Sequence, residues 1–231
     1  MKTIGLIGGM SWESSLEYYR LINEYVKARL GGLHSAQCLM LSVDFAPVEQ
    51  LQRSGKWEES GLMMAQAAAA LQAGGAECIV LCTNTMHIVA DAVQQAVSIP
   101  FIHIADAAAG AVLAAGICKV GLLGTRFTME KEFYKDRLKE KFNLDVVIPA
   151  DEDRETVHRI IYNELVLGII RQESRREYIR IIQDMQQQGA EGVILGCTEI
   201  GLLVGPEDSP LPLFDTTRIH AEAAVEFALN E

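Results

Sequence analysis

One stretch of the sequence is present twice, about half a chain apart. Residues 75–85, GAECIVLCTNT, align without gaps with residues 189–199, GAEGVILGCTE, at an offset of 189 − 75 = 114. Residues 4–8, IGLIG, likewise align with residues 120–124, VGLLG, at an offset of 120 − 4 = 116. A period this long is unlike that of solenoid repeats. It predicts two similar halves, each containing strands that end in polar residues.

Apolar, strand-like runs alternate with helical stretches along the whole chain. The runs are TIGLIGG, QCLMLSV, CIVLC, PFIHI, KVGLLG, LDVVIP, GVILGC and LPLFD. Continuous apolar strands separated by helices are typical of parallel sheets covered on both faces. The first helix is expected to begin with a capping box of Ser14 and Glu17 and to end at Gly31 and Gly32. Further helices are expected at 58–73, 86–97, 105–115, 129–141, 154–169, 174–188 and 216–229.

The predicted fold is therefore α/β, with two similar parallel-sheet domains related by a pseudo-twofold. We expect residues 1–100 plus 212–231 to form the first domain, with the last helix returning to it, and residues 101–211 to form the second. Ligands of open parallel sheets bind outside the carboxyl ends of the strands. The sequence thus predicts an active site in the cleft between the two domains.

Composition narrows the class of protein. The formal net charge of −11, with no run of Lys or Arg, argues against nucleic acid or an acidic membrane surface as a partner. No stretch reaches the roughly 18 continuous apolar residues of a membrane span, and the first residues do not read as a signal peptide. The 5 cysteines are an odd number, none in C-x-x-C spacing, which favours reduced thiols and a cytoplasmic location.

Cys197 is the cysteine whose position favours chemistry. It leaves a predicted strand at the start of a predicted helix, where backbone N–H groups and the helix dipole stabilise a thiolate. Cys38, Cys78 and Cys118 lie in or beside apolar strands, and they are expected to be small buried hydrophobic residues. Cys197 is thus a candidate base or nucleophile.

Short polar residues follow both copies of the repeated strand. Asn84 and Thr85 follow one copy, and Thr198 and Glu199 follow the other. Helix N-termini at these positions would bind a carboxylate, although Asn and Thr are also ordinary N-caps. GLIGGM matches neither a dinucleotide fingerprint nor a P-loop, so its glycines are expected to form a tight turn with Met10 and Ser11 at its edge.

No metal site is expected from the histidines. His87 and Asp91 are four residues apart on a predicted helix, and such a pair is usually a helix-surface interaction. No motif surrounds His34, His103, His158 or His220.

The motifs CTNTMH and GCTEI, at the ends of corresponding strands, resemble the cofactor-independent aspartate/glutamate racemase family. The resemblance extends over essentially the whole chain and includes GLIGGMSWES, SVDFAP, LLGTRFTM and LPLFDTT. It implies two residues on opposite faces of the substrate's α-carbon, one removing a proton and the other delivering one. It also implies that no pyridoxal phosphate or metal is used. The residues after each catalytic position would hold the α-carboxylate and ammonium, here Asn84, Thr85 and Thr198.

The chain departs from the family pattern at the first catalytic position. Both the N-T motif and the internal repeat place Thr83 where the family has cysteine, opposite Cys197. A shift of one residue would bring Cys82 into that position, but it would displace Asn84 and Thr85 because side chains alternate along a strand. A hydroxyl is a poor base compared with a thiol. The resemblance therefore implies that Cys197 deprotonates the L enantiomer, with turnover favouring L-to-D.

Aspartate or glutamate is the expected substrate. Gln52 or Arg53, placed on a loop after SVDF, would contact the distal carboxylate, whereas Glu164 stands where some relatives supply a lysine. The complete set of expected site residues is Thr83 and Cys197 for catalysis, and Met10, Ser11, Gln52, Arg53, Asn84, Thr85, Thr125, Thr198 and Glu199 for substrate binding.

Other functions fit the same residues. A racemase of neutral polar amino acids, a decarboxylase that keeps only the second-half cysteine, and an amino-acid-binding protein that has lost catalysis are the alternatives. Helix faces rich in Ala and Leu suit a homodimer.

Overall fold

The computed structural model describes residues 1–230. They form two compact units: unit 1, which comprises Met1–Ile104 and the chain from His220 onward, and unit 2, Ala105–Ile219. Each unit contains a four-stranded parallel sheet, with strand orders β2-β1-β3-β4 and β6-β5-β7-β8. The predicted pair of parallel sheets is confirmed, and the duplicated sequence corresponds to the same strand order used twice.

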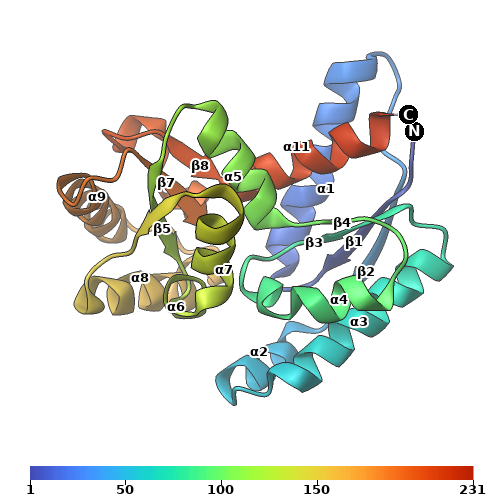
Figure 1. Cartoon of the computed structure of the whole chain (residues 1–231), viewed down its shortest axis with the longest axis horizontal. Coiled ribbons are helices and arrows are strands. Elements are labelled where there is room, and N and C mark those ends of the chain that lie inside the picture. Colours follow the sequence, from blue (N-terminus) through green and yellow to red (C-terminus); the bar gives the residue numbers. More distant parts are fainter. Residues whose placement is uncertain (231) are drawn as a thin grey trace. The chain divides into compact units, whose positions relative to one another are not determined.

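Unit 1 alternates strands and helices, as Figure 1 shows. Its elements are β1 (Ile4–Gly8), α1 (Trp12–Leu30), β2 (Cys38–Ser42), α2 (Phe45–Arg53), α3 (Trp57–Ala73), β3 (Cys78–Leu81), η1 (Thr85–Val89), α4 (Ala90–Ala96), β4 (Phe101–Ile102) and most of α11 (Thr216–Leu229). Helices α1 and α11 lie side by side on one face of the sheet, and α3 and α4 lie together on the other.

The strands of unit 1 send alternate side chains into two separate cores. Leu6 and Val80 pack with α1 and α11, whereas Ile7, Ile79 and Leu81 pack with α3. This two-residue alternation is the geometry of a strand. Because both faces are covered by helices, the strands are apolar throughout, as the sequence pattern indicated.

Unit 2 is built on the same plan. Its elements are α5 (Ile104–Ala114, of which Ile104 belongs to unit 1), β5 (Lys119–Gly124), α6 (Arg126–Glu130), α7 (Glu132–Asp136), η2 (Arg137–Lys141), β6 (Asp145–Val147), α8 (Asp151–Asn163), η3 (Leu165–Leu167), α9 (Gln172–Gln187), β7 (Gly192–Gly196), α10 (Ile200–Leu203), η4 (Pro206–Asp208) and β8 (Leu213–Asp215). Helices α8 and α9 pack on β5 and β7 in one apolar core.

Several expected boundaries differ from the structure. Residues 101–104 were assigned to the second domain, but β4 pairs with β3 and these residues belong to unit 1. Residues 212–219 were assigned to the first domain, but β8 pairs with β7 and these residues therefore belong to unit 2. Helix α1 begins at Trp12, because the Ser11 side chain accepts a hydrogen bond from the Ser14 N–H and takes the capping position expected for Ser14. Helix α2 was not predicted, so Gln52 lies on a helix rather than on a loop.

A glycine fixes the turn between β1 and α1. Gly9 has φ +95°, and a Cβ at this position would lie 2.1 Å from the Val43 carbonyl oxygen. We expect Gly9→Ala to destabilise the fold by about 2 kcal/mol or more, through the positive φ and the clash together. This corresponds to a melting temperature lower by about 4–8 °C.

The matched control for this substitution is Gly75→Ala. Gly75 has φ +100°, and a Cβ at this position would meet no heavy atom within 4 Å beyond its chain neighbours, so this variant carries the backbone penalty without the clash. Thermal unfolding of both variants measures the difference. Equal losses of stability would show that the contact with Val43 relaxes at no cost.

None of the helices within residues 1–230 combines the length and the apolar character needed to cross a lipid bilayer.

Candidate active site

Polar residues gather at the carboxyl end of the sheet of unit 1. Strands β1 and β3 run side by side with Ile7 opposite Leu81, so the segments that follow them leave the same edge. Ser14, in the first turn of α1, donates its hydroxyl to the Cys82 carbonyl oxygen at 3.3 Å. Thr83 and the two residues after it are buried at this edge. The expected residues after β1 and β3 are thus brought together within unit 1.

Cys82 and Thr83 differ in their surroundings. Cys82 continues the face of β3 that carries Cys78 and Val80, and it is enclosed in the core under α1 and α11. Burial raises the pKa of its thiol far above the ordinary range. Thr83 instead lies beyond the end of β3, with its N–H donated to the Leu81 carbonyl oxygen at 2.8 Å. This geometry favours the register in which Thr83, and not Cys82, occupies the site.

Gln52 and Arg53, the two residues expected to contact the distal carboxylate of a substrate, lie in different surroundings. Gln52 is buried on α2 and donates its Nε2 to the sulfur of Met86 at 3.0 Å, so it lies against the segment that follows Thr85. Met10 belongs to the same core cluster as Met86. The side chain of Arg53 is 79% exposed and pairs with Glu49 at 2.7 Å. Gln52 therefore lies with the unit 1 site, and Arg53 points away from the core.

In unit 2 the corresponding edge is formed by β5 and β7. Gly124 lies opposite Gly196 at the ends of these strands, so Thr125 and Cys197 follow paired positions. Thr125 caps α6, and its side chain accepts a hydrogen bond from the Thr128 N–H. The two expected residues of this half are therefore neighbours at the carboxyl edge of the second sheet.

Cys197 has a carboxylate as its hydrogen-bond partner. Its Sγ donates to Glu199 Oε2 at 3.0 Å, and Thr198 Oγ1 donates to the same oxygen at 2.7 Å. All three side chains are buried or half-buried. Glu199, expected only to bind substrate, is thus the hydrogen-bond acceptor of the thiol.

The resting thiol is protonated. Burial, and next to it the negative charge of Glu199, hold the pKa of Cys197 well above its usual range. The sequence suggested the opposite direction, on the assumption of a helix N-terminus beside the sulfur. The helix that follows, α10, is a single turn of Ile200–Leu203, so its dipole is small compared with the cost of burying a thiolate.

Further acidic and aromatic side chains surround this pair. Burial raises the pKa of Tyr178, and the neighbouring acidic groups Cys197, Glu164 and Glu199 raise it further. Glu164 accepts a hydrogen bond from Ser174 Oγ at 2.5 Å. Sequence reasoning did not find Tyr178, because it joins the core cluster of Cys197 from α9 and belongs to no local motif.

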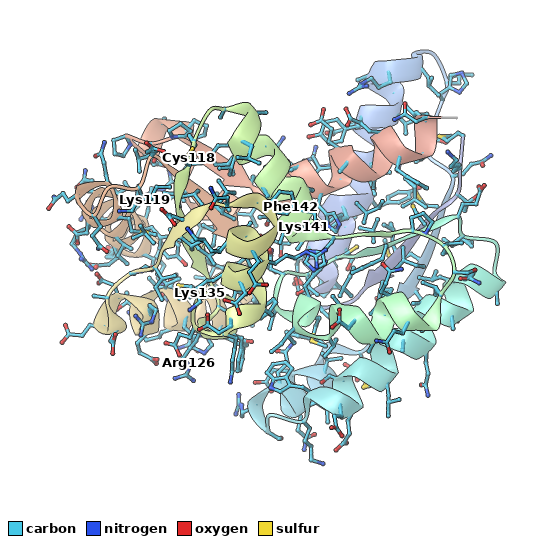
Figure 2. All side chains as sticks on the ribbon, in the orientation of Figure 1. Cys118, Lys119, Arg126, Lys135, Lys141 and Phe142 are labelled. Atoms are coloured by element: carbon cyan, nitrogen blue, oxygen red, sulfur yellow. The ribbon has the colours of Figure 1, made fainter. Side chains whose placement is uncertain are left out.

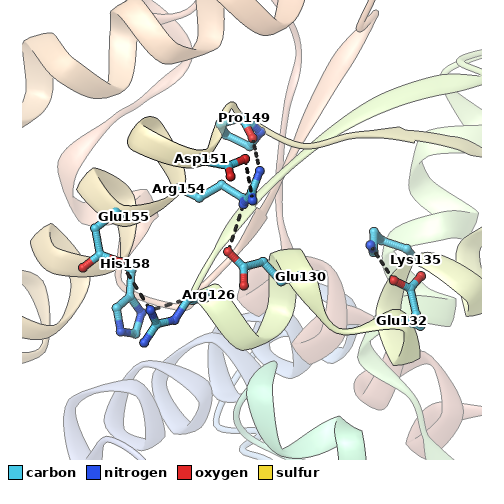
Figure 3. Close-up of polar contacts among 9 residues, drawn as sticks. All are labelled: Arg126, Glu130, Glu132, Lys135, Pro149, Asp151, Arg154, Glu155 and His158. Atoms are coloured by element: carbon cyan, nitrogen blue, oxygen red, sulfur yellow. Dashed lines mark hydrogen bonds and ion pairs between the residues drawn. The ribbon is translucent and has the colours of Figure 1, made fainter.

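The segment after β5 is held against α8 by polar contacts, drawn in Figure 3. The Arg126 N–H donates to His158 Nδ1 at 3.2 Å, and the Arg126 side chain pairs with Glu155. Burial, followed by the charge of Arg126, lowers the pKa of His158. Arg154 joins α8 to α6 through Glu130 at 3.0 Å. These contacts fix the loop that carries Thr125.

Cys118 lies at the other end of the same strand. Figure 2 shows Cys118 and Lys119 far from Arg126, because they stand at the amino end of β5 and Arg126 follows its carboxyl end. Cys118 is exposed and Cys38 is half-buried, so of the three cysteines expected in the core only Cys78 is fully buried. Cys118 lies just before the first residue of β5, outside the strand itself, and this position explains its exposure.

A family model for Asp/Glu/hydantoin racemases matches residues 7–224. The chain belongs to this family. A candidate Asp/Glu racemase from Yersinia pestis is 55% identical, with a TM-score of 0.94 over 100% of both chains. An aspartate racemase homologue from Pyrococcus horikoshii OT3 is 38% identical, with a TM-score of 0.87 over 100% of both chains. The broad specificity amino-acid racemase RacX of Bacillus subtilis (strain 168) is 23% identical over 96% of each chain.

Beside the site of this racemase-family chain lie histidines that sequence reasoning had set aside. His87 was interpreted as a helix-surface residue, but it is 2% exposed, and His103 and His220 are buried as well. The only local signal was that His87 ends the CTNTMH motif. Among the described residues, no group of three or more His, Cys, Asp or Glu side chains is arranged to hold a metal ion.

Proposed function

We propose that the protein is an amino-acid racemase that interconverts L- and D-aspartate or glutamate by direct proton transfer at the α-carbon, without a cofactor. The observation that carries the proposal is the thiol–carboxylate pair of Cys197 and Glu199, 3.0 Å apart at the end of β7. A weakly acidic thiol with an adjacent acceptor is the arrangement expected of an activated base. The proposal requires Thr83 and Cys197 to serve opposite faces of one substrate α-carbon.

Deprotonation starts from the resting thiol. Because burial and Glu199 disfavour the thiolate, the Cys197 proton passes to Glu199 only when positive charge arrives nearby. The ammonium group of a bound amino acid supplies that charge. Substrate binding thereby produces the base that removes the α-proton, and Cys197 becomes a thiol again as it takes that proton.

Reprotonation falls to the side of Thr83. A threonine hydroxyl can pass a proton from water to the carbanion, taking one as it gives one, but it cannot act as a strong base. The hydroxide left by that water is neutralised by the proton that Glu199 took from Cys197 and returns to solvent, which restores the starting state. An enzyme with unequal groups on the two faces has unequal kcat values from L and D. Enantiomers have equal free energies, so kcat/KM must nevertheless be equal in the two directions. The preference for L-to-D is therefore a difference in kcat that KM compensates.

Aspartate or glutamate is placed first because of the relatives. The Yersinia pestis protein, a candidate Asp/Glu racemase, and the Pyrococcus horikoshii protein, an aspartate racemase homologue, both align with this chain over its full length. Gln52, buried against the segment after Thr85, is the group of α2 that could donate to a distal carboxylate.

A racemase of neutral amino acids is the second candidate. Arg53 is the cation proposed for a distal carboxylate, but it is exposed and already paired with Glu49. RacX, similar over 96% of the chain, is described as having broad specificity.

The test is loss of the α-proton signal in heavy water. Proton NMR follows L- and D-aspartate, L- and D-glutamate and a panel of neutral amino acids, with polarimetry or chiral chromatography for the product. We expect exchange and D product from an acidic L substrate. Exchange confined to neutral amino acids would select the second candidate. Binding without exchange would leave a binding protein, and release of carbon dioxide from a substituted malonate would identify a decarboxylase.

Replacing Thr83 by cysteine should speed proton transfer on the Thr83 side of the α-carbon. A thiol is a far better acid and base near neutral pH than a hydroxyl, so we expect kcat/KM to rise by about tenfold or more in both directions. The kcat from the D enantiomer should rise most. Thr83→Ser keeps the hydroxyl and serves as the control, with rates within about threefold of the wild type. A Thr83→Cys protein no faster than Thr83→Ser would show that reprotonation does not limit turnover.

A further inference from the structure

Three buried histidines lie together in unit 1, and the proposed mechanism uses none of them. The ring centroid of His87 lies 4.5 Å from that of His103 and 5.9 Å from that of His220. His87 also stacks on Phe101, with ring centroids 5.4 Å apart. A ring packed on several sides in this way has one orientation. Whatever His87 bonds is therefore held in a fixed place.

The two ring nitrogens of His87 have opposite roles. Nδ1 is 2.7 Å from the Thr83 carbonyl oxygen, which can only accept, so Nδ1 carries the proton and donates it. Nε2 accepts the Ile104 N–H at 3.2 Å, so it carries none. The hydrogen-bond partners thus assign the neutral Nδ1–H tautomer. A second proton on the ring would face the Ile104 N–H and break that bond.

The bond to Thr83 replaces one that the backbone does not make. In an α-helical turn the N–H of His87 would bond the carbonyl of Thr83, but η1 is a 3-10 turn and this N–H bonds the Asn84 carbonyl at 3.1 Å. The Thr83 carbonyl, buried with its residue, is satisfied by the imidazole instead. One side chain therefore completes the turn that carries Thr83 and Asn84.

Fixing this carbonyl fixes the whole peptide unit. A trans peptide is planar, so its C=O and the following N–H point in opposite directions. With the Thr83 carbonyl turned to His87, the N–H of Asn84 points to the opposite side of the turn. The Thr83 N–H is also held, by the Leu81 carbonyl. The orientation of the Thr83 side chain thus depends on two bonds, one of which comes from His87.

A second histidine supports the segment that holds His87. His220 donates Nε2–H to the Ile102 carbonyl oxygen at 2.7 Å and accepts the Tyr18 hydroxyl at Nδ1 at 2.8 Å. Burial lowers the pKa of His220 to about 4, so the ring is neutral at physiological pH. Ile102 and Ile104 are consequently anchored on either side of His103. His220 does not itself bond Thr83, which makes it a matched control.

We propose that His87 is a positioning residue for Thr83, holding the Thr83–Asn84 peptide through its Nδ1–H so that the Thr83 hydroxyl can protonate the substrate carbanion. This role rests on the proposed racemase function. It concerns one face of the α-carbon only. Removal of the α-proton by Cys197 does not depend on it.

The test compares two reactions that differ in which face of the α-carbon they use. Racemisation needs both the Cys197 face and the Thr83 face. A 3-chloro-L-aspartate probe needs only α-proton removal: the proton goes to Cys197, the electron pair forms a Cα–Cβ double bond and chloride leaves. The resulting enamine hydrolyses to oxaloacetate and ammonium, and malate dehydrogenase with NADH measures the oxaloacetate. If the α-proton assay finds a neutral substrate, β-chloro-L-alanine, which gives pyruvate, takes its place.

Two substitutions of His87 differ in whether they keep an N–H donor for the Thr83 carbonyl oxygen. His87→Leu has no such donor, and we expect its racemisation rate to fall by about 10²-fold, the effect of a misplaced reacting group. Its elimination rate should stay within about threefold of the wild type. His87→Asn keeps an N–H at the position of Nδ1 and should recover most of the racemisation. His220→Gln, equally buried but without a bond to Thr83, should leave the ratio of the two reactions unchanged.

Equal loss of racemisation and elimination in His87→Leu would overturn the proposal. A racemisation rate in His87→Asn no higher than that in His87→Leu would also overturn it. If His87→Leu does not fold, His87→Asn is compared with the wild type, and nitrogen-15 NMR of the wild-type rings decides: an Nε2–H or doubly protonated His87 at pH 7 excludes the role. A wild-type protein with neither reaction would refute the proposed function itself, a result distinct from a changed ratio in the variants.

Discussion

Replacing Cys197 by serine is expected to lower α-proton removal from the L substrate by about 10²–10⁴-fold, the range spanned by general acid–base groups. Serine is close to cysteine in size, so the core of unit 2 around it, which includes Tyr178 and Ile200, should keep its packing. A hydroxyl does not release its proton to a carboxylate near neutral pH. The measurement is the initial rate of α-proton exchange in heavy water, with circular dichroism to confirm the fold.

The matched control is Cys82→Ala, one residue before Thr83. Cys82 is fully enclosed under α1 and α11, and burial raises the pKa of its thiol. Its loss should cost about 1 kcal/mol of stability through a small cavity and leave the exchange rate within about threefold. A Cys82→Ala protein as inactive as Cys197→Ser would instead favour the shifted register, in which Cys82 and not Thr83 acts on the substrate.

The fold could be predicted from the sequence because the pattern of apolar runs and the internal repeat indicate the same arrangement of strands. All eight apolar runs are strands, and the repeated segments become β3 and β7 with the same neighbours in each sheet. Helix α2 was missed because it has only nine residues and contains Pro47 in its first turn. The start of α1 was displaced because Ser11 and Ser14 are both acceptable caps, and only the backbone geometry decides between them.

The candidate site was only partly accessible, because sequence motifs locate residues and do not show what their side chains contact. Thr83 and Cys197 follow from the aligned repeat. The direction of the Cys197 pKa shift does not, since it depends on burial and on the rotamer of Glu199. The partners of His220 lie far away in sequence: it bonds Ile102, 118 residues away, and Tyr18, 202 residues away. Such contacts follow from the packing of a unit and leave no local pattern.

Replacing Glu199 by glutamine is expected to change two properties of Cys197 in opposite directions. Glu199 raises the pKa of the thiol, both by its charge and by accepting its hydrogen bond, although burial contributes more. Without the carboxylate the pKa of Cys197 falls, and the thiolate fraction in the resting protein rises. Alkylation of Cys197 by iodoacetamide at pH 8 should therefore become faster. The exposed Cys118 provides an internal reference within the same digest, read by mass spectrometry.

Catalysis in Glu199→Gln should nevertheless fall, by about 10²-fold, because the amide cannot take the Cys197 proton when substrate binds. Loss of a carboxylate that only held the local structure would lower or leave unchanged both the alkylation rate and turnover. Faster alkylation with slower α-proton exchange is the combination that identifies Glu199 as the proton acceptor. Faster alkylation with faster exchange would mean that Glu199 merely suppresses the thiolate, and that the Cys197 proton leaves by another path.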